Sequence, residues 1–130
     1  MREMSEITIY AIRCKANGKM YVGRSGALES RIRCYFTELR AGRKKGRDEN
    51  GRITKADIQL DYDKFGESAF EVVVLEENVG YLEGLRREKY WIEEYQTTDP
   101  RYGYNRRTEK HAGRTIPIVK ELPPKPKRGE

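Results

Sequence analysis

The chain has 130 residues, a length that suits one domain with a modest hydrophobic core. Charged residues make up 37% and hydrophobic residues 36%, and no apolar run approaches the length needed to span a membrane. With two cysteines and one histidine, the sequence excludes a zinc site of the usual Cys and His spacing. The net charge of +6 favours a polyanionic partner.

The N-terminal residues lack the apolar stretch of a signal peptide, so we expect a cytoplasmic protein that does not enter a membrane. In a reducing cytosol, Cys14 and Cys34 are expected to be thiols. Basic residues gather in two groups, which could be an ordinary solvated surface or a contact for nucleic acid. The groups are Arg40, Arg43, Lys44, Lys45, Arg47, Arg52 and Lys55, and then Arg101, Arg106, Arg107, Lys110 and Arg114.

Residues 7–13 and 19–23 are predicted to form the two strands of a β-hairpin, because Asn17-Gly18 between them is a strong turn signal. In a two-residue type I′ turn, the numbers of paired residues add up to 35, the sum of 17 and 18. Tyr10 and Tyr21 would then project from the same face of the hairpin.

The pattern of the remaining sequence predicts an α+β fold, with a small antiparallel sheet of about three strands flanked by helices. Thr54 is expected to cap the second helix, and Gly66 is expected to end it. The other predicted elements are a helix at 28–40, a mobile loop at 41–53, a helix at 55–64, a buried strand at 70–75 and a helix at 81–95. Residues 1–112 would form the domain, and residues 113–130 a basic, proline-rich, extended tail.

Glu88 interrupts an apolar stripe on the predicted helix 81–95, which otherwise consists of Tyr81, Leu85, Ile92 and Tyr95. A carboxylate in such a stripe is costly unless it is paired or bound to a cation. Two interpretations remain open, a structural salt bridge to a buried arginine and a bound metal ion.

Arg31 is the matching anomaly on the helix at 28–40, where it falls within a stripe of Leu28, Ile32, Tyr35 and Leu39. A guanidinium in this position must meet an anion. That anion could be the carboxylate of Glu88 or a phosphate group.

Thr8-Ile9-Tyr10 and Tyr21-Val22-Gly23 resemble the two name-giving tripeptides of the GIY-YIG endonuclease superfamily. Arg31 on the next helix, Glu88 on a later helix and Gly103-Tyr104-Asn105 follow in the order of that family, over residues 7–107. The resemblance implies a GIY-YIG nuclease-like fold with the same small antiparallel sheet.

The resemblance also implies roles for these residues. In the family, the glutamate at the position of Glu88 is the one protein ligand of a divalent metal, which implies Mg²⁺ or Mn²⁺ here. Arg31 would stabilise charge on the scissile phosphate, and Tyr10 or Tyr21 would orient or deprotonate the attacking water. A phenol acts as a base only when cations lower its pKa, and Arg24 could supply such a cation.

Six residues are predicted to contact the substrate or to support the site. They are Arg24, Tyr35, Asn105, Arg43, Lys44 and Lys45. An alternative role for Asn105 is to form a cap or a turn. The chain departs from the family at Thr8, which replaces a glycine, and at Tyr35, where many members carry a histidine. The variant with a tyrosine resembles the 3′-incision domain of bacterial excision-repair endonucleases.

The combined interpretation is a metal-dependent DNA endonuclease that hydrolyses phosphodiester bonds, with double-stranded DNA as the expected substrate. The alternatives are a non-catalytic DNA-binding protein on the same fold and an RNA-directed nuclease, because phosphate contacts do not identify the sugar. Because no DNA-reading module is recognisable, specificity would come from residues 41–53, the basic tail, a homodimer or a separate targeting partner.

Overall fold

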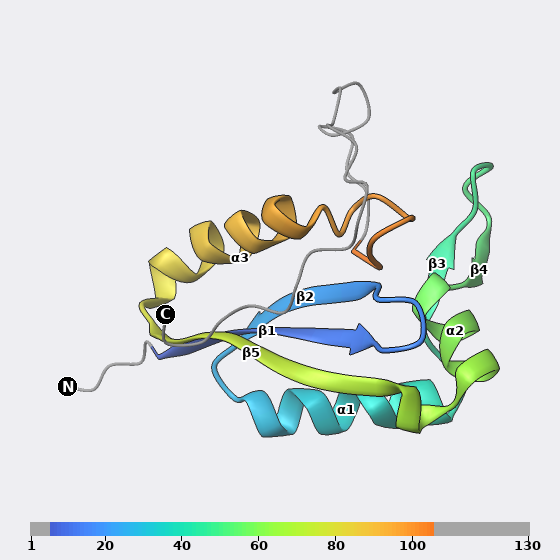
Figure 1. The fold of residues 1–130 in the computed structure, drawn as a ribbon, viewed down its shortest axis with the longest axis horizontal. Coiled ribbons are helices and arrows are strands. Elements are labelled where there is room, and N and C mark those ends of the chain that lie inside the picture. Colours follow the sequence, from blue (N-terminus) through green and yellow to red (C-terminus); the bar gives the residue numbers. More distant parts are fainter. Residues whose placement is uncertain (1–5, 106–130) are drawn as a thin grey trace.

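The computed structural model describes residues 6–105, which form a three-stranded antiparallel sheet between two long helices (Figure 1). The strand order is β2-β1-β5, where β1 is Ile7–Cys14, β2 is Met20–Ser25 and β5 is Phe70–Val79. Helix α1, Leu28–Arg40, covers one face, and helix α3, Tyr81–Tyr95, covers the other (Figure 1). The prediction of a small antiparallel α+β fold is confirmed.

The central strand β1 supplies both hydrophobic cores, because its successive side chains point to opposite faces of the sheet. Ile9 and Ala11 are buried on the α3 face, and Tyr10 and Ile12 are buried on the α1 face. The α1 face also buries Tyr35, Phe36 and Leu39, which recur at helical spacing.

The β1–β2 hairpin pairs Ile9 with Arg24 and Tyr10 with Gly23, so the numbers of paired residues add up to 33. The predicted sum of 35 is therefore wrong. A type I′ turn needs positive φ at both central residues, and here Gly18 has φ +81° while Asn17 does not lie in the left-handed region. Asn17 instead accepts from the Lys19 amide and donates to Asp61. Because the register moved by two residues, Tyr10 and Tyr21 remain on one face.

Residues 41–53 are not the loop that was predicted. They contain most of a two-stranded ribbon, in which β3, Lys45–Arg47, pairs with β4, Ile53–Lys55. Asp48 holds the turn of this ribbon by accepting from the amides of Asn50 and Arg52. Thr54 therefore lies in a strand and does not cap helix α2, Asp57–Phe65, whose N-cap is Ala56. Gly66, with φ +88°, follows the last helical residue as predicted.

Strand β5 runs further than predicted and forms an edge of the sheet, so Val72 is 38% exposed. The exposed face of α3 also differs from the prediction, because Tyr81 and Leu85 point to solvent. The helix instead turns Gly84 toward β1, where a Cβ would lie 3.2 Å from Cγ2 of Ile7. The missing side chain at Gly84 sets which face of α3 meets the sheet.

Within residues 6–105, no helix combines the length and the apolar character needed to cross a lipid bilayer. Cys14 is buried and Cys34 is exposed, and both are free thiols. The predicted domain boundary at residues 112 and 113, the tail and His111 lie outside the described residues.

Candidate active site

Tyr10 and Tyr21 lie together on the α1 face, near the edge of the sheet formed by β2. Their ring centroids are 6.4 Å apart. Tyr10 pairs with Gly23 on the neighbouring strand, and a Cβ on Gly23 would lie 2.7 Å from the Tyr10 hydroxyl oxygen. The absence of a side chain at Gly23 therefore lets the Tyr10 phenol pass across β2 toward the edge.

Helix α1 places Arg31 against both phenol oxygens. Its hydrogen bond to Tyr10 is the main cause of a raised pKa of the guanidinium, with further contributions from Tyr21. Arg31 itself is exposed, and the rings beside it are mostly covered. Two phenols and one guanidinium thus meet at one point where a ligand can reach the cation.

Burial raises the pKa of both tyrosines above the ordinary value. For Tyr10 the charge of Tyr21 adds to burial, and hydrogen bonding to Arg31 opposes it. For Tyr21 the charges of Arg31 and Arg24 both oppose burial without overcoming it. Arg24 therefore lowers the pKa of the Tyr21 phenol, as expected of a nearby cation, but this effect is smaller than that of burial and the pKa stays above its ordinary value. Both hydroxyls remain protonated near neutral pH and can donate hydrogen bonds.

Glu88 joins the site from the opposite helix, α3. Its Oε1 accepts from Nη1 of Arg24 on β2 at 2.6 Å, and its side chain is 19% exposed. The charge of Glu88 also raises the pKa of Tyr10 and of Tyr21, which places it near both phenols. The structure therefore pairs Glu88 with Arg24, whereas the sequence pointed to Arg31 as its structural partner.

The site lies at the β2 edge because α1 and α3 cover opposite faces of the same edge strand (Figure 1). Arg24 belongs to the α3 face, and Tyr21 belongs to the α1 face. Side chains on the α1 face and side chains on the α3 face can therefore meet only by passing around the outer edge of β2.

The donor set around Glu88 suits a hydrated hard cation. The described part of the chain holds no group of three or more His, Cys, Asp or Glu side chains that could bind a metal. One carboxylate beside two phenols fits Mg²⁺ or Mn²⁺, which can keep several water ligands, and does not fit structural zinc.

Tyr35 and Lys44 lie behind the site. The rings of Tyr35 and Tyr21 have centroids 5.2 Å apart, and Nζ of Lys44 lies 3.7 Å from the Tyr35 centroid. Lys44 also pairs with Glu38 at 2.8 Å, and this hydrogen bond lowers the pKa of the Glu38 carboxyl. Because Tyr35 is only 5% exposed, the structure places this predicted substrate contact in a packed position.

Arg43 and Lys45 are exposed at the start of the β3–β4 ribbon. The ribbon is a different element from those that carry the two tyrosines, Arg31 and Glu88. Among the described residues, no interaction joins either side chain to Tyr10, Tyr21 or Glu88. Their predicted contact with substrate would thus occur beside the site.

Asn105 is committed to the backbone of β2. Its Oδ1 accepts from the Val22 amide at 2.8 Å, and its Nδ2 donates to the Val22 carbonyl at 3.0 Å. Two further backbone hydrogen bonds join Met20 to Tyr102 and Tyr104 on either side of a parallel bridge to Gly103. The segment therefore covers the outer edge of β2 next to Tyr21 and Gly23.

Most of the chain matches a known protein family. Residues 6–105 match the model of the GIY-YIG catalytic domain, which is more than half of the chain. The chain belongs to the GIY-YIG family. It is a nuclease domain of that family, as the order of its motifs predicted.

Two solved structures resemble this GIY-YIG domain, each with 27% sequence identity. The catalytic domain of homing endonuclease I-TevI has a TM-score of 0.61, covering 77% of this chain and 97% of that chain. A mutant of the catalytic domain of intron endonuclease I-TevI has a TM-score of 0.60, covering 77% of this chain and 92% of that chain. No curated protein matches the chain significantly.

Sequence reasoning missed Gln59, a fully buried residue of α2 that joins α1 and the segment before β3 in this GIY-YIG domain. Its Oε1 accepts from the Lys44 amide, and its Nε2 donates to the Leu39 carbonyl and to Asp63. Gln59 precedes the exposed Leu60 in a short polar helix, so the sequence carried no signal that this amide would be buried.

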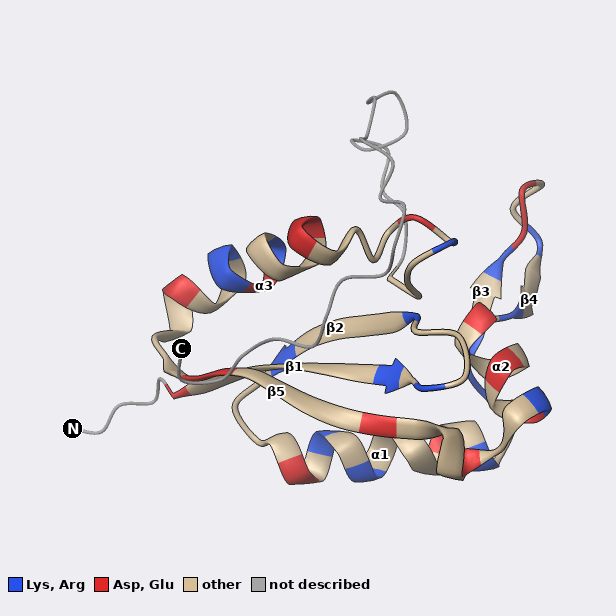
Figure 2. Cartoon of the chain, viewed as in Figure 1, with Lys and Arg blue, Asp and Glu red and all other residues tan. Residues whose placement is uncertain are grey.

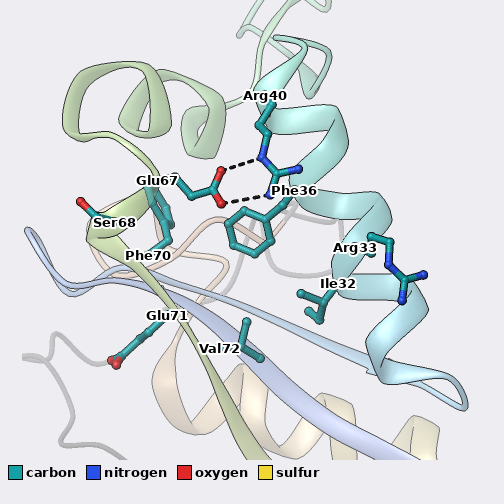
Figure 3. A pocket seen from close by; sticks show the side chains of 9 residues that line it. All are labelled: Ile32, Arg33, Phe36, Arg40, Glu67, Ser68, Phe70, Glu71 and Val72. Carbon is teal, nitrogen blue, oxygen red and sulfur yellow. Dashed lines mark hydrogen bonds and ion pairs between the residues drawn. The ribbon is translucent and has the colours of Figure 1, made fainter.

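A separate pocket of about 450 Å³ lies on the other side of α1, beside the free edge of β5 (Figure 3). Arg40 and Glu67 form two hydrogen bonds across it, of 2.9 and 3.0 Å. None of its lining residues belongs to the GIY-YIG site, so we assign the chemistry to the β2 edge.

Proposed function

We propose that this chain is a divalent-metal-dependent endonuclease that hydrolyses phosphodiester bonds in double-stranded DNA. The observation that carries the proposal is the meeting of Arg31, two protonated phenols and Glu88 at one edge of the sheet. This set offers a cation, hydrogen-bond donors and a carboxylate to one phosphate. The I-TevI structures, described as homing and intron endonuclease domains, support DNA as the substrate.

Arg31 would neutralise charge that develops on the phosphoryl oxygens. Its guanidinium is exposed, and hydrogen bonds to the phenols fix its orientation. The side chain therefore needs little reorganisation when the phosphate binds. Tyr10 and Tyr21 would donate hydrogen bonds to the attacking water or to the phosphate. Their raised pKa values favour this role over that of a general base.

The reaction would be a simple hydrolysis. The oxygen of water forms the new bond to phosphorus, the bond from phosphorus to O3′ breaks, and the leaving oxygen takes up a proton to become a hydroxyl. The proton lost by the water would pass to solvent, because both phenols are already protonated.

Glu88 would hold the metal ion. A bound Mg²⁺ or Mn²⁺ would supply Lewis-acid stabilisation of the phosphate and of the leaving oxygen. Arg24 occupies one oxygen of Glu88 and would have to move away or share that carboxylate. After moving, Arg24 would be free to bind a neighbouring phosphate of the DNA.

Two alternatives are distinguished by the same experiment. A non-catalytic DNA-binding protein would retain binding without cleavage, and an RNA-directed enzyme would prefer RNA. The presence of both Arg31 and Glu88 near the two phenols favours catalysis, because a binding surface has no need for a carboxylate near the phosphate.

The test is incubation of purified protein with supercoiled plasmid and with duplex RNA, with Mg²⁺ or with a chelator. An Arg31→Ala preparation serves as the control for contaminating nucleases. We expect nicked or linear plasmid only with wild-type protein and Mg²⁺. Binding without cleavage in Mg²⁺ and in Mn²⁺ would contradict the proposal, as would selective cleavage of the RNA.

A further inference from the structure

The β3–β4 ribbon presents one exposed face made of four side chains. Directly opposite residues of an antiparallel pair share a face, and alternate residues along each strand do as well. The pairs Lys45 with Lys55 and Arg47 with Ile53 therefore define this face. All four residues are exposed. We call these four residues the ribbon face.

The opposite side of the ribbon carries the pair Gly46 and Thr54, of which Thr54 is exposed. Gly46 is half-buried, and a Cβ on Gly46 would lie 3.5 Å from the Cα of Ala56. Because Gly46 has no side chain and Thr54 is uncharged, the ribbon face is the side on which a partner would meet basic side chains. Figure 2 shows basic positions along the ribbon and acidic ones at its tip.

The charges of the ribbon face are poorly compensated by the protein itself. Lys45 and Lys55 are directly opposite each other, and like charges in this position destabilise a strand pair. Lys55 pairs with Asp63 at 2.7 Å, but in the described part of the chain neither Lys45 nor Arg47 has an ion pair with a carboxylate. An external polyanion would supply the missing negative charge.

Ile53 lies among these cations with 66% of its surface exposed. An apolar side chain flanked by Arg47 and Lys55 does not serve the core of this domain. Such a side chain can contact the methyl group of thymine, which is exposed in the major groove of DNA.

The ribbon is anchored to the element that carries Arg31. The Ala56 amide donates to the Lys44 carbonyl at 3.0 Å, and the Lys44 amide donates to the buried Gln59. Gln59 in turn donates to the Leu39 carbonyl on α1 at 2.9 Å. The base of the ribbon is therefore fixed relative to the active site.

The dimensions suit a duplex. Leu39 lies eight positions after Arg31 on α1, which corresponds to about 12 Å along the helix. From Lys45 to its turn, the ribbon reaches about 14 Å, and the major groove is about 12 Å wide and admits a two-stranded ribbon.

We propose that the ribbon face is a second DNA contact, which lies in the major groove beside the cleaved phosphate. Lys45, Arg47 and Lys55 bind phosphates, and Ile53 contacts thymine methyl groups. This inference rests on DNA being the substrate of the proposed nuclease. The ribbon would contribute part of the affinity for DNA and a preference for thymine at the contacted positions.

The first experiment measures the binding of full-length protein to a labelled DNA duplex at several salt concentrations, in a chelator so that no cleavage occurs. A Lys45→Gln and Arg47→Gln double variant is compared with a charge-matched Arg33→Gln and Arg86→Gln double variant. Each phosphate contact contributes about 0.9 to the slope of log K against log salt. We expect the ribbon variant to lower the slope by about 1.8 relative to the matched control.

The second experiment tests the groove and Ile53. Wild-type and Ile53→Ala proteins are compared on duplexes of one sequence that contain either thymine or uracil, which lacks the methyl group. Loss of one methyl contact should weaken wild-type binding about fourfold, while Ile53→Ala should bind both duplexes equally. A-form duplex RNA, whose deep and narrow major groove excludes the ribbon, should show no dependence on Lys45 and Arg47.

Equal salt slopes for the ribbon and control variants would overturn the ribbon proposal. So would an equal change in the affinities of the wild-type and Ile53→Ala proteins when uracil replaces thymine. If the plasmid is still cleaved in Mg²⁺, the nuclease proposal stands without the ribbon. If the ribbon variants weaken DNA binding but no protein cleaves the plasmid, the ribbon proposal stands and the nuclease proposal fails.

Discussion

At the scale of single residues, space at Gly23 decides whether the site can form. Tyr10 starts on the central strand and reaches the edge only by crossing β2 at the residue that lacks a side chain. Its phenol then meets Tyr21 and Arg31. The glycine is needed here for the room it leaves and not for its backbone freedom, because Gly23 has no positive φ.

Replacement of Gly23 by alanine should therefore disturb both fold and activity. The added Cβ would lie 2.7 Å from the Tyr10 hydroxyl oxygen, and overpacking of this kind costs about 1–3 kcal/mol. We expect a lower free energy of unfolding in urea and a large loss of plasmid cleavage. Gly26→Ala is the matched control, because its Cβ would lie 3.7 Å from Ile7, an ordinary contact. Equal behaviour of the two variants would show that Gly23 does not make room for Tyr10.

Removal of either phenol hydroxyl should slow the chemical step. A lost hydrogen-bond donor to the reacting group reduces the rate on the order of 10²-fold. We expect this for Tyr10→Phe and Tyr21→Phe in single-turnover cleavage at saturating DNA, with unchanged binding. Tyr62→Phe is the control, since its hydroxyl donates to Glu67 on the pocket side of α1. Wild-type rates for both test variants would remove the phenols from the mechanism.

At the scale of elements, Asn105 acts as a strap on the edge strand. Its two hydrogen bonds to Val22, together with those of Met20, cover the backbone of β2 next to the site. A side chain far along the sequence thus fixes the strand that carries Tyr21 and Gly23.

Asn105→Ala should loosen this edge locally. Two lost hydrogen bonds should reduce the free energy of unfolding by about 1–3 kcal/mol and speed hydrogen exchange of the Val22 amide. Asn17→Ala removes two hydrogen bonds at the far end of the same hairpin and should leave Val22 exchange unchanged. If Val22 exchanges at the wild-type rate in Asn105→Ala, the strap interpretation is wrong.

The elements with strong periodicity could be predicted from the sequence, and the ribbon could not. Leu28–Arg40 and Tyr81–Tyr95 match their predicted ranges because apolar residues recur at helical spacing. The β3–β4 ribbon has no apolar alternation, and it forms through the Asp48 turn and the buried Gln59. The face of α3 was misjudged because Gly84, which has no side chain, marks its closest approach to the sheet.

For the candidate site, the sequence predicted which residues would gather but not the contacts that they form. Motif order pointed to Tyr10, Tyr21, Arg31 and Glu88, and the structure brings these four together. The pairing of Glu88 with Arg24 depends on how α3 passes the β2 edge, which no spacing encodes. Burial of the phenols, which sets their pKa values, likewise depends on the packed fold.

At the scale of the whole molecule, buried tyrosines make the free energy of unfolding fall at high pH. Burial is the main cause of a raised pKa for Tyr10, Tyr21, Tyr35 and Tyr104, and it raises the pKa of Tyr95 to about 12. The unfolded chain ionises near the ordinary tyrosine pKa of about 10, whereas the folded chain resists ionisation. Their contribution is therefore complete below that pH and is lost as the pH rises through the folded values.

Urea unfolding should accordingly give nearly constant stability from neutral pH to about pH 9 and a decline above about pH 10. Tyr35→Phe should reduce the decline, because it removes one group that ionises only on unfolding. A decline of the same size in Tyr35→Phe would contradict the assignment of this effect to Tyr35.

We propose that one site at the β2 edge cleaves DNA, with Glu88 as its metal-binding carboxylate. The most direct measurement is the single-turnover cleavage rate of Glu88→Gln at saturating DNA and Mg²⁺, with the affinity for the same DNA measured in parallel. The amide keeps the shape of the side chain and removes its charge, so we predict a rate loss on the order of 10³-fold with unchanged or tighter binding. A Glu88→Gln protein that cleaves at nearly the wild-type rate would contradict the claim.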